Sequence, residues 1–87
     1  MSILKVSIEQ IKAARALLRW SQVDLAGKSG ISIPTIKRLE SVSGEIGGRS
    51  ETATAIRAAL EAAGIEFIAE NGGGAGVRLK KRTDHEL

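Results

Sequence analysis

The sequence predicts a mainly α-helical domain that ends in a two-stranded β-hairpin. Four stretches repeat apolar residues at helical spacing, and each begins at a serine that can cap a helix. After Gly64 the spacing changes to alternation around a glycine-rich loop, which is typical of paired strands. A chain of 87 residues has room for one such domain. We therefore expect a compact four-helix domain over residues 1–64, a hairpin over 65–82 and a disordered tail over 83–87.

The first helix has complete start signals. Ser7 can cap it, and Gln10 stands three residues later at the reciprocal capping-box position. Val6 and Ile11 have the spacing of a hydrophobic staple. The helical spacing that follows predicts a core-facing stripe of Ile8, Ile11, Ala14, Leu17 and Leu18.

The second helix is short and ends at a glycine. Ser21 can cap it, and Asp24 follows three residues later as a carboxylate near the positive end of the helix. Leu25 and Ala26 are expected to face inward. Gly30 supplies the left-handed residue that ends the helix.

A third helix follows directly after this glycine. Ser32 can cap it, and Pro34 falls in its first turn, where a missing amide proton costs little. Its spacing exposes Lys37 and Arg38, with no acidic residue on the outer face before Glu40. An exposed cationic helix suggests an anionic partner, which the net charge of +3 favours weakly.

A loop separates this helix from the fourth. The stretch SVSGEIGGRS, residues 41–50, has three glycines, three serines and no apolar period, so we expect a loop there. Ser50 can cap the alanine-rich helix ETATAIRAALEAA, which ends at Gly64.

The C-terminal stretch is expected to fold as a β-hairpin. IEFIAE and VRLKK alternate around the glycine loop NGGGAG, so apolar residues pair with apolar residues and Glu66 and Glu70 meet the cations of the return strand. An isolated hairpin is marginal in water and leaves a strand edge unpaired. We expect it to join two copies of the chain, although it could instead only cap the core of its own domain. The apolar residues that would form this homodimer are Ile65, Phe67, Ile68, Val77 and Leu79.

The residues needed for enzyme chemistry are scarce. The chain has no cysteine and no tyrosine, and its single histidine, His85, lies three residues from the C-terminus. NGGGAGV at 71–77 fails the spacing of a phosphate-binding loop, because Val77 stands where the last glycine is needed. We expect no enzyme activity, no cofactor and no metal site.

The sequence also bears on where the protein works. No apolar run approaches the roughly 20 residues of a membrane span. The N-terminal MSILKVSIEQ lacks the apolar core and cleavage site of a signal peptide. Together with the absence of cysteine, these features predict a cytoplasmic protein.

Residues 15–40 hold several side-chain types at fixed offsets. They are Gln22 after the cap of the second helix, the pair Leu25 and Ala26, Gly30 in the turn, Ile31 after it, Ser32 as the next cap, and Ile36 and Leu39 on the inner face of the third helix. This combination resembles the helix-turn-helix of the Cro/C1-type (phage-repressor, XRE-like) DNA-binding family, over about 50 of the 87 residues. The resemblance implies a lambda-repressor-like fold with the motif at about 21–40. It also implies an ion pair between Arg15 and Glu40 that ties the first helix to the end of the third.

The resemblance assigns the third helix to the major groove of double-stranded DNA, whose width of about 12 Å accepts a helix. Arg38 could then read a guanine, whereas Ile33 and Pro34 could read shape or a thymine methyl group. Gln22 could bond a phosphate or a base edge from the start of the second helix. The predicted DNA-binding residues are Gln22, Ser32, Ile33, Pro34, Thr35, Lys37 and Arg38.

Two functions remain open at this point. The first is a sequence-specific, repressor-like transcriptional regulator that binds an inverted repeat as a homodimer. The second is an antitoxin or antiactivator whose helix-turn-helix or hairpin holds another protein, in which case Lys37 and Arg38 form an ordinary solvated helix face. The basic residues favour the first, since a protein without a DNA role would be free to place acidic residues at 33, 34, 37 or 38.

Overall fold

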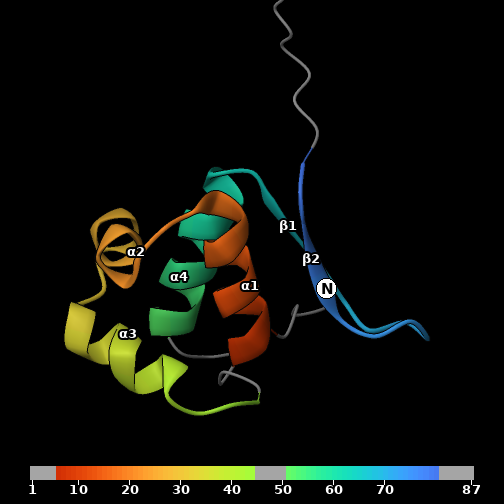
Figure 1. The fold of residues 1–87 in the computed structure, drawn as a ribbon, viewed down its shortest axis with the longest axis horizontal. Helices are drawn as coiled ribbons and strands as arrows, with labels where there is room; N and C mark the ends of the chain where they lie inside the picture. Colours follow the sequence, from red (N-terminus) through yellow and green to blue (C-terminus); the bar gives the residue numbers. More distant parts are fainter. Residues whose placement is uncertain (1–5, 45–50, 81–87) are drawn as a thin grey trace, which may run out of the picture.

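The computed structural model describes residues 6–44 and 51–80, which form four helices followed by an antiparallel hairpin (Figure 1). In chain order these are α1 (Ile8–Leu18), α2 (Gln22–Ser29), α3 (Ile33–Glu40), α4 (Glu51–Ala62), β1 (Ile65–Ile68) and β2 (Gly76–Leu79). The predicted fold class is confirmed. The expected cap Ser50 and the expected tail 83–87 lie outside the described residues.

The first three helices begin at the predicted serines. Ser7 Oγ accepts a hydrogen bond from Gln10 N at 3.0 Å, and Gln10 Oε1 accepts one from Ser7 N at 2.9 Å, which completes the capping box of α1. Ser21 and Asp24 form the same reciprocal pair at the start of α2. The hydroxyl of Ser32 caps α3. These local bonds fix where each helix begins.

Residues in the left-handed conformation end α1 and α2. Gly30 ends α2 with φ 78°, as predicted. Arg19 ends α1 with φ 60°, and within the described residues it is the one residue other than glycine with positive φ. The sequence gives no sign of this position, because a left-handed helix end is usually occupied by glycine.

The core lies where all four helices and one face of the hairpin meet. Its buried apolar residues are Val6, Ile8, Ile11, Ala14, Leu25, Ile36, Ile56, Leu60, Ile65 and Phe67. The expectation that Leu17 belongs to this core is wrong, because its exposed fraction is 45%. Successive residues of a helix point about 100° apart, so the inward position of Leu18 turns Leu17 away from the core.

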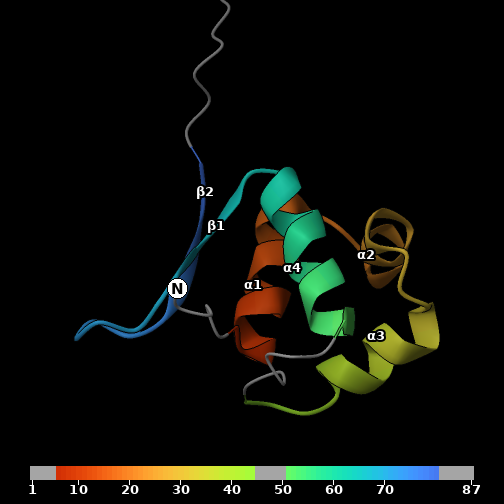
Figure 2. The same cartoon turned by 180° about the vertical axis from the view of Figure 1, so that it is seen from behind.

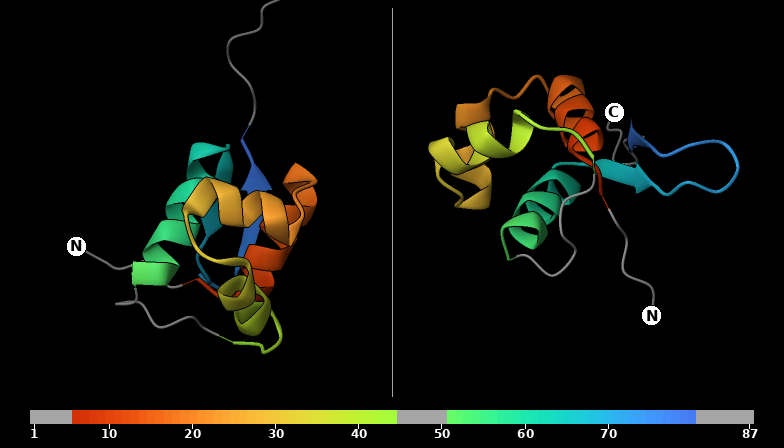
Figure 3. Two further views of the ribbon diagram at one scale, coloured as in Figure 1. Left: turned by 90° about the vertical axis from the view of Figure 1, so that its left-hand side faces the viewer. Right: turned by 90° about the horizontal axis from the view of Figure 1, so that it is seen from below.

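The hairpin packs on the opposite side of the α1–α4 pair from α2 and α3 (Figure 2). β2 contacts α1 and β1 contacts α4, and the connecting loop extends away from the helices (Figure 3, right). In the observed register Phe67 pairs with Val77 and Ile65 with Leu79, so apolar residues do oppose each other as predicted. The expectation that Ile65 and Phe67 contact a second copy is wrong, because both are buried in the core of their own chain.

The strands are shorter than the sequence suggested. Each has four residues, and the last pair joins Ile68 to Gly76. Glu66 does pair with Arg78, at 3.1 Å between Oε1 and Nε. Glu70 lies beyond the end of β1, so its expected contact with the cations of β2 is not formed.

Gln10 fastens the hairpin to α1. Its side-chain Nε2 donates to the carbonyl oxygen of Gly76 at 2.8 Å and to that of Ile68 at 3.3 Å. The residue is only 5% exposed. One amide therefore completes the helix cap and satisfies two carbonyl groups at the end of the hairpin ladder.

We predict that Gly30→Ala lowers the free energy of unfolding by about 1 kcal/mol, because a left-handed backbone is unfavourable for a residue with a Cβ. A Cβ at Gly30 would meet no atom within 4 Å, so the effect is one of backbone strain alone. Urea denaturation measures it.

Gly27→Ala is the matched control. Gly27 lies inside α2, and a Cβ there also meets nothing within 4 Å. Removing a glycine from a helix interior should raise stability by about 0.5–1 kcal/mol. Equal changes at both positions would contradict the left-handed assignment of Gly30.

Candidate nucleic-acid interface

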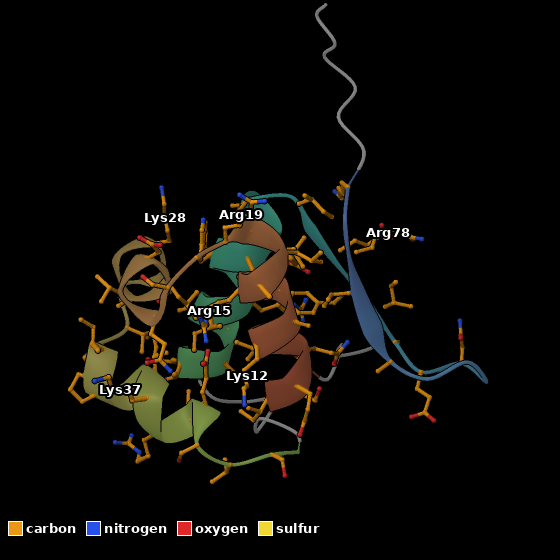
Figure 4. The ribbon with its side chains drawn as sticks, in the orientation of Figure 1. Lys12, Arg15, Arg19, Lys28, Lys37 and Arg78 are labelled. Atoms are coloured by element: carbon orange, nitrogen blue, oxygen red, sulfur yellow. The ribbon has the colours of Figure 1, made fainter. Side chains whose placement is uncertain are left out.

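The outer side of α3 presents two cations. Pro34, Lys37 and Arg38 are exposed, whereas Ile36 on the opposite side is fully buried. Residues three and four apart in a helix share one side, so these three exposed side chains form a single stripe. Figure 4 shows Lys37 at the outer surface of α3, away from the helices of the core.

These cations are not neutralised within the described part of the chain. Neither Lys37 nor Arg38 forms an ion pair with a residue that the structure describes. The first turn of α3 contains no acidic residue. The one carboxylate of the whole helix α3, that of Glu40, is buried and already paired with Arg15. The positive charge of the stripe is therefore available to an external anion.

The remaining predicted residues of α3 gather at its start. Ser32 Oγ donates to Thr35 Oγ1 at 2.9 Å and accepts from Thr35 N at 3.3 Å. Ser32 is exposed, whereas Thr35 and Ile33 are only partly exposed. The first turn of α3 thus offers hydroxyl groups at the surface, with Ile33 set back between surface and core.

Gln22 has a contact that the sequence did not predict. It begins α2, and its Nε2 donates to Glu40 Oε1 at 3.0 Å, at the far end of α3. Its Oε1 has no hydrogen-bond partner among the described residues. The side chain is therefore anchored at one end and can accept a hydrogen bond at the other.

Arg15 is the centre of a polar cluster that joins α1, α2 and α3. Its Nε and Nη2 donate to the two carboxylate oxygens of Glu40 at 2.8 Å and 2.6 Å. Its Nη1 donates to the carbonyl oxygen of Trp20 at 2.8 Å, in the link between α1 and α2. The side chains of Arg15 and Glu40 are 18% and 5% exposed. The ion pair that the resemblance implied is confirmed.

The electrostatics of this cluster keep Glu40 ionised. Burial raises the pKa of the Glu40 carboxyl group, because it disfavours the charged form. Hydrogen bonds from Arg15 and Gln22, with the charges of Arg15 and Lys12, lower that pKa by more. The pKa therefore lies below its ordinary value of 4.5, and the carboxylate is charged at neutral pH.

The described residues contain neither a metal-binding cluster nor a helix that could cross a membrane. Over residues 6–44 and 51–80, no three metal-binding side chains gather in one place. The longest described helix, α4, has 12 residues, whereas a membrane span needs about 20.

α2 and α3 are two short helices joined by Gly30 in the left-handed conformation, and α3 is basic on its outer side. This arrangement is typical of a helix-turn-helix motif. Residues 11–46 match the family model described as helix-turn-helix. Residues 11–46 carry a Cro/C1-type helix-turn-helix. This family consists of DNA-binding transcription regulators. No curated protein matches the sequence. In this helix-turn-helix, α2 and α3 are the paired helices, and Arg15 and Glu40 tie them to α1.

We predict that Glu40→Gln lowers the free energy of unfolding by about 3 kcal/mol at pH 7, because it leaves Arg15 without its counter-charge. The folded pKa of Glu40 lies below 4.5, so the pair contributes fully above that pH and is lost as the pH falls through the folded pKa. The stability difference between wild type and variant should therefore shrink below about pH 4.5. Urea denaturation between pH 7 and pH 3 measures it.

Glu61→Gln serves as the control for this experiment. It removes a pair with Arg57 at 3.4 Å in α4, with side chains 35% and 41% exposed. Such a pair contributes about 0–1 kcal/mol, so the variant should stay close to wild type. A constant difference for Glu40→Gln down to pH 3 would contradict the lowered pKa of Glu40.

Proposed function

We propose that the protein is a repressor-like transcriptional regulator that acts in the cytoplasm. In this proposal it binds an inverted-repeat operator as a homodimer, with α3 of each copy in the major groove. The observation that carries the proposal is the pair of exposed cations, Lys37 and Arg38, that find no counter-charge in the described chain. They lie on the second helix of a helix-turn-helix, which enters the groove in this class of motif.

The chemistry of α3 suits this role. The guanidinium group of Arg38 is the side chain best matched to the O6 and N7 atoms of guanine. Lys37 lies beside it and suits a phosphate, which accepts a point charge without a fixed geometry. Pro34 offers only apolar surface, which suits a thymine methyl group. The hydroxyl groups of Ser32 and Thr35 stand at the start of the helix, where such helices approach the bases.

Gln22 would combine two tasks in this proposal. Its Nε2 donates a hydrogen bond to Glu40, and its Oε1 would accept a hydrogen bond from a base amino group or from a water bound to the DNA. Ile33, set back from the surface, would support the first turn of α3 rather than make a main contact.

The homodimer part of the proposal concerns the hairpin. The hairpin packs on the far side of the α1–α4 pair from α3, so pairing there leaves both recognition helices uncovered (Figure 2). A twofold dimer binds half-sites one helical turn of DNA, roughly 34 Å, or a multiple of it apart. In this proposal the bound dimer represses transcription where its site overlaps a promoter.

Selection of bound DNA from a random pool tests the proposal directly. The purified protein should enrich an inverted repeat, and the distance between half-sites should be constant. No enriched sequence at low salt would overturn the proposal and favour the protein-binding alternative, an antitoxin or antiactivator.

We predict that Arg38→Ala weakens binding to the selected operator by about 1–3 kcal/mol and relaxes the preference at one base pair of each half-site. The loss of a bidentate guanine contact is the physical reason. Fluorescence anisotropy with operator variants at that base pair measures both effects.

Lys37→Ala should behave differently. Removing a phosphate contact weakens binding to all sequences alike and lowers the slope of log K against log salt by about 1 per copy. Lys28→Gln is the control, since the exposed side chain of Lys28 points away from α3 and its loss removes the same charge (Figure 4). If both α3 variants bind like the control, the groove assignment of α3 is wrong.

A further inference from the structure

Two of the exposed large apolar residues lie on neighbouring elements, α1 and β2, on a surface that the proposed DNA contact leaves uncovered. Leu17 on α1 is 45% exposed, and Leu79 at the end of β2 is 46% exposed. α1 contacts β2, and the two elements run in the same direction (Figure 1). This surface is on the hairpin side of the molecule, away from α3 (Figure 2).

The spacing along α1 and β2 sets Leu17 and Leu79 at a similar height on the two elements. Gln10 is bonded to Gly76, which fixes one point of contact between α1 and β2. Leu17 follows Gln10 by seven residues, which is about two turns, so it lies on the same side of the helix roughly 10 Å further along. Leu79 follows Gly76 by three residues, which is also roughly 10 Å in a strand. Both side chains therefore stand at the same level.

The neighbours of these two residues extend the apolar surface. Ala13 is exposed one turn before Leu17, and Val77 is half-buried beside the core. We call Ala13, Leu17, Val77 and Leu79 the α1–β2 patch. A patch that contains exposed leucines on both a helix and a strand is typical of a protein–protein contact.

The adjacent edge of β2 is open. Lys80 N donates to the carbonyl oxygen of Gly64, which makes Glu66–Arg78 the next hydrogen-bonded pair of the ladder. The main-chain groups of Val77 and Leu79 then point outward from the sheet, and they have no partner among the described residues. Such an edge is usually covered in a native protein.

The charges around the α1–β2 patch indicate which partner covers it. At one end stand acidic residues, Glu9 at the start of α1 and Glu70 just past β1. At the other end stand the cations Arg19, at the end of α1, and Lys80, just past β2, whereas Arg78 is already paired with Glu66. A second copy turned antiparallel sets the acidic end of one patch against the basic end of the other. A parallel copy would bring like charges together.

We propose that the α1–β2 patch is the interface of the homodimer, with two copies antiparallel about a twofold axis. This inference rests on the homodimer proposed above, and it moves the contact from the hairpin alone to a surface that α1 shares. The apolar residues form its centre, and the opposite charges of its two ends fix the orientation.

Sedimentation equilibrium of the full chain tests the interface. Leu17→Glu should raise the dimer dissociation constant by about 100-fold or more, because the twofold axis buries two charges among apolar side chains. Ala13→Arg is a second variant on the same patch and should act in the same direction. Val23→Glu is the matched control, since Val23 is 60% exposed on α2 and should leave the dimer intact.

The outcomes separate this interface from the DNA-binding proposal. A wild-type chain that is monomeric at high micromolar concentration, or a Leu17→Glu chain that dimerises like the control, overturns the α1–β2 interface. Circular dichroism checks that each variant is folded. We expect each variant to fold, because the changed positions are exposed. The monomeric variant should still select the same half-site sequence from random DNA. Loss of that preference would count against α3 as the reader and not against the interface.

Discussion

The contact between Arg15 and Glu40 is the constraint on which the helix-turn-helix depends. α2 and α3 are short helices of eight residues each, so their few apolar contacts leave their mutual angle weakly defined. The carboxylate of Glu40 receives donors from α1 and from the start of α2, and the same arginine holds the link between those helices. Since breaking a buried pair leaves an uncompensated charge, this arrangement tolerates little movement of α3.

α1 connects the two functional sides of the molecule. Arg15 points toward α3, whereas Gln10 holds the end of the hairpin. Five residues turn a helix by about 140° beyond one full turn, so these two side chains leave α1 in different directions. The recognition helix α3 and the proposed dimer surface are therefore both positioned relative to α1. The distance between two recognition helices in a dimer then follows from how the copies of α1 are placed.

The positive charge on the outer side of α3 is not neutralised by the nearest acidic residue, because Glu40 pairs with Arg15 instead. Glu40 could pair with Lys37 one turn before it on an isolated helix. In the fold it turns inward to Arg15 and Gln22, which leaves the outer side of α3 positive. The same burial that positions the helix thus also sets its surface charge, and that charge is what a DNA backbone would meet.

Local patterns in the sequence were enough to predict much of the fold of this protein. The starts of the first three helices, the left-handed Gly30 and the apolar register of the hairpin each depend on residues close together in the chain, so spacing alone predicts them. The family resemblance supplied the pair of Arg15 with Glu40. Tertiary structure alone decided the bond of Gln22 to Glu40 and the two bonds of Gln10 to the hairpin, whose partners lie 18, 58 and 66 residues away. It also decided that Leu17 faces solvent and that Arg19 is left-handed, because the packing of α1 against its neighbours, and not its own periodicity, selects which side of the helix is buried and where it must end.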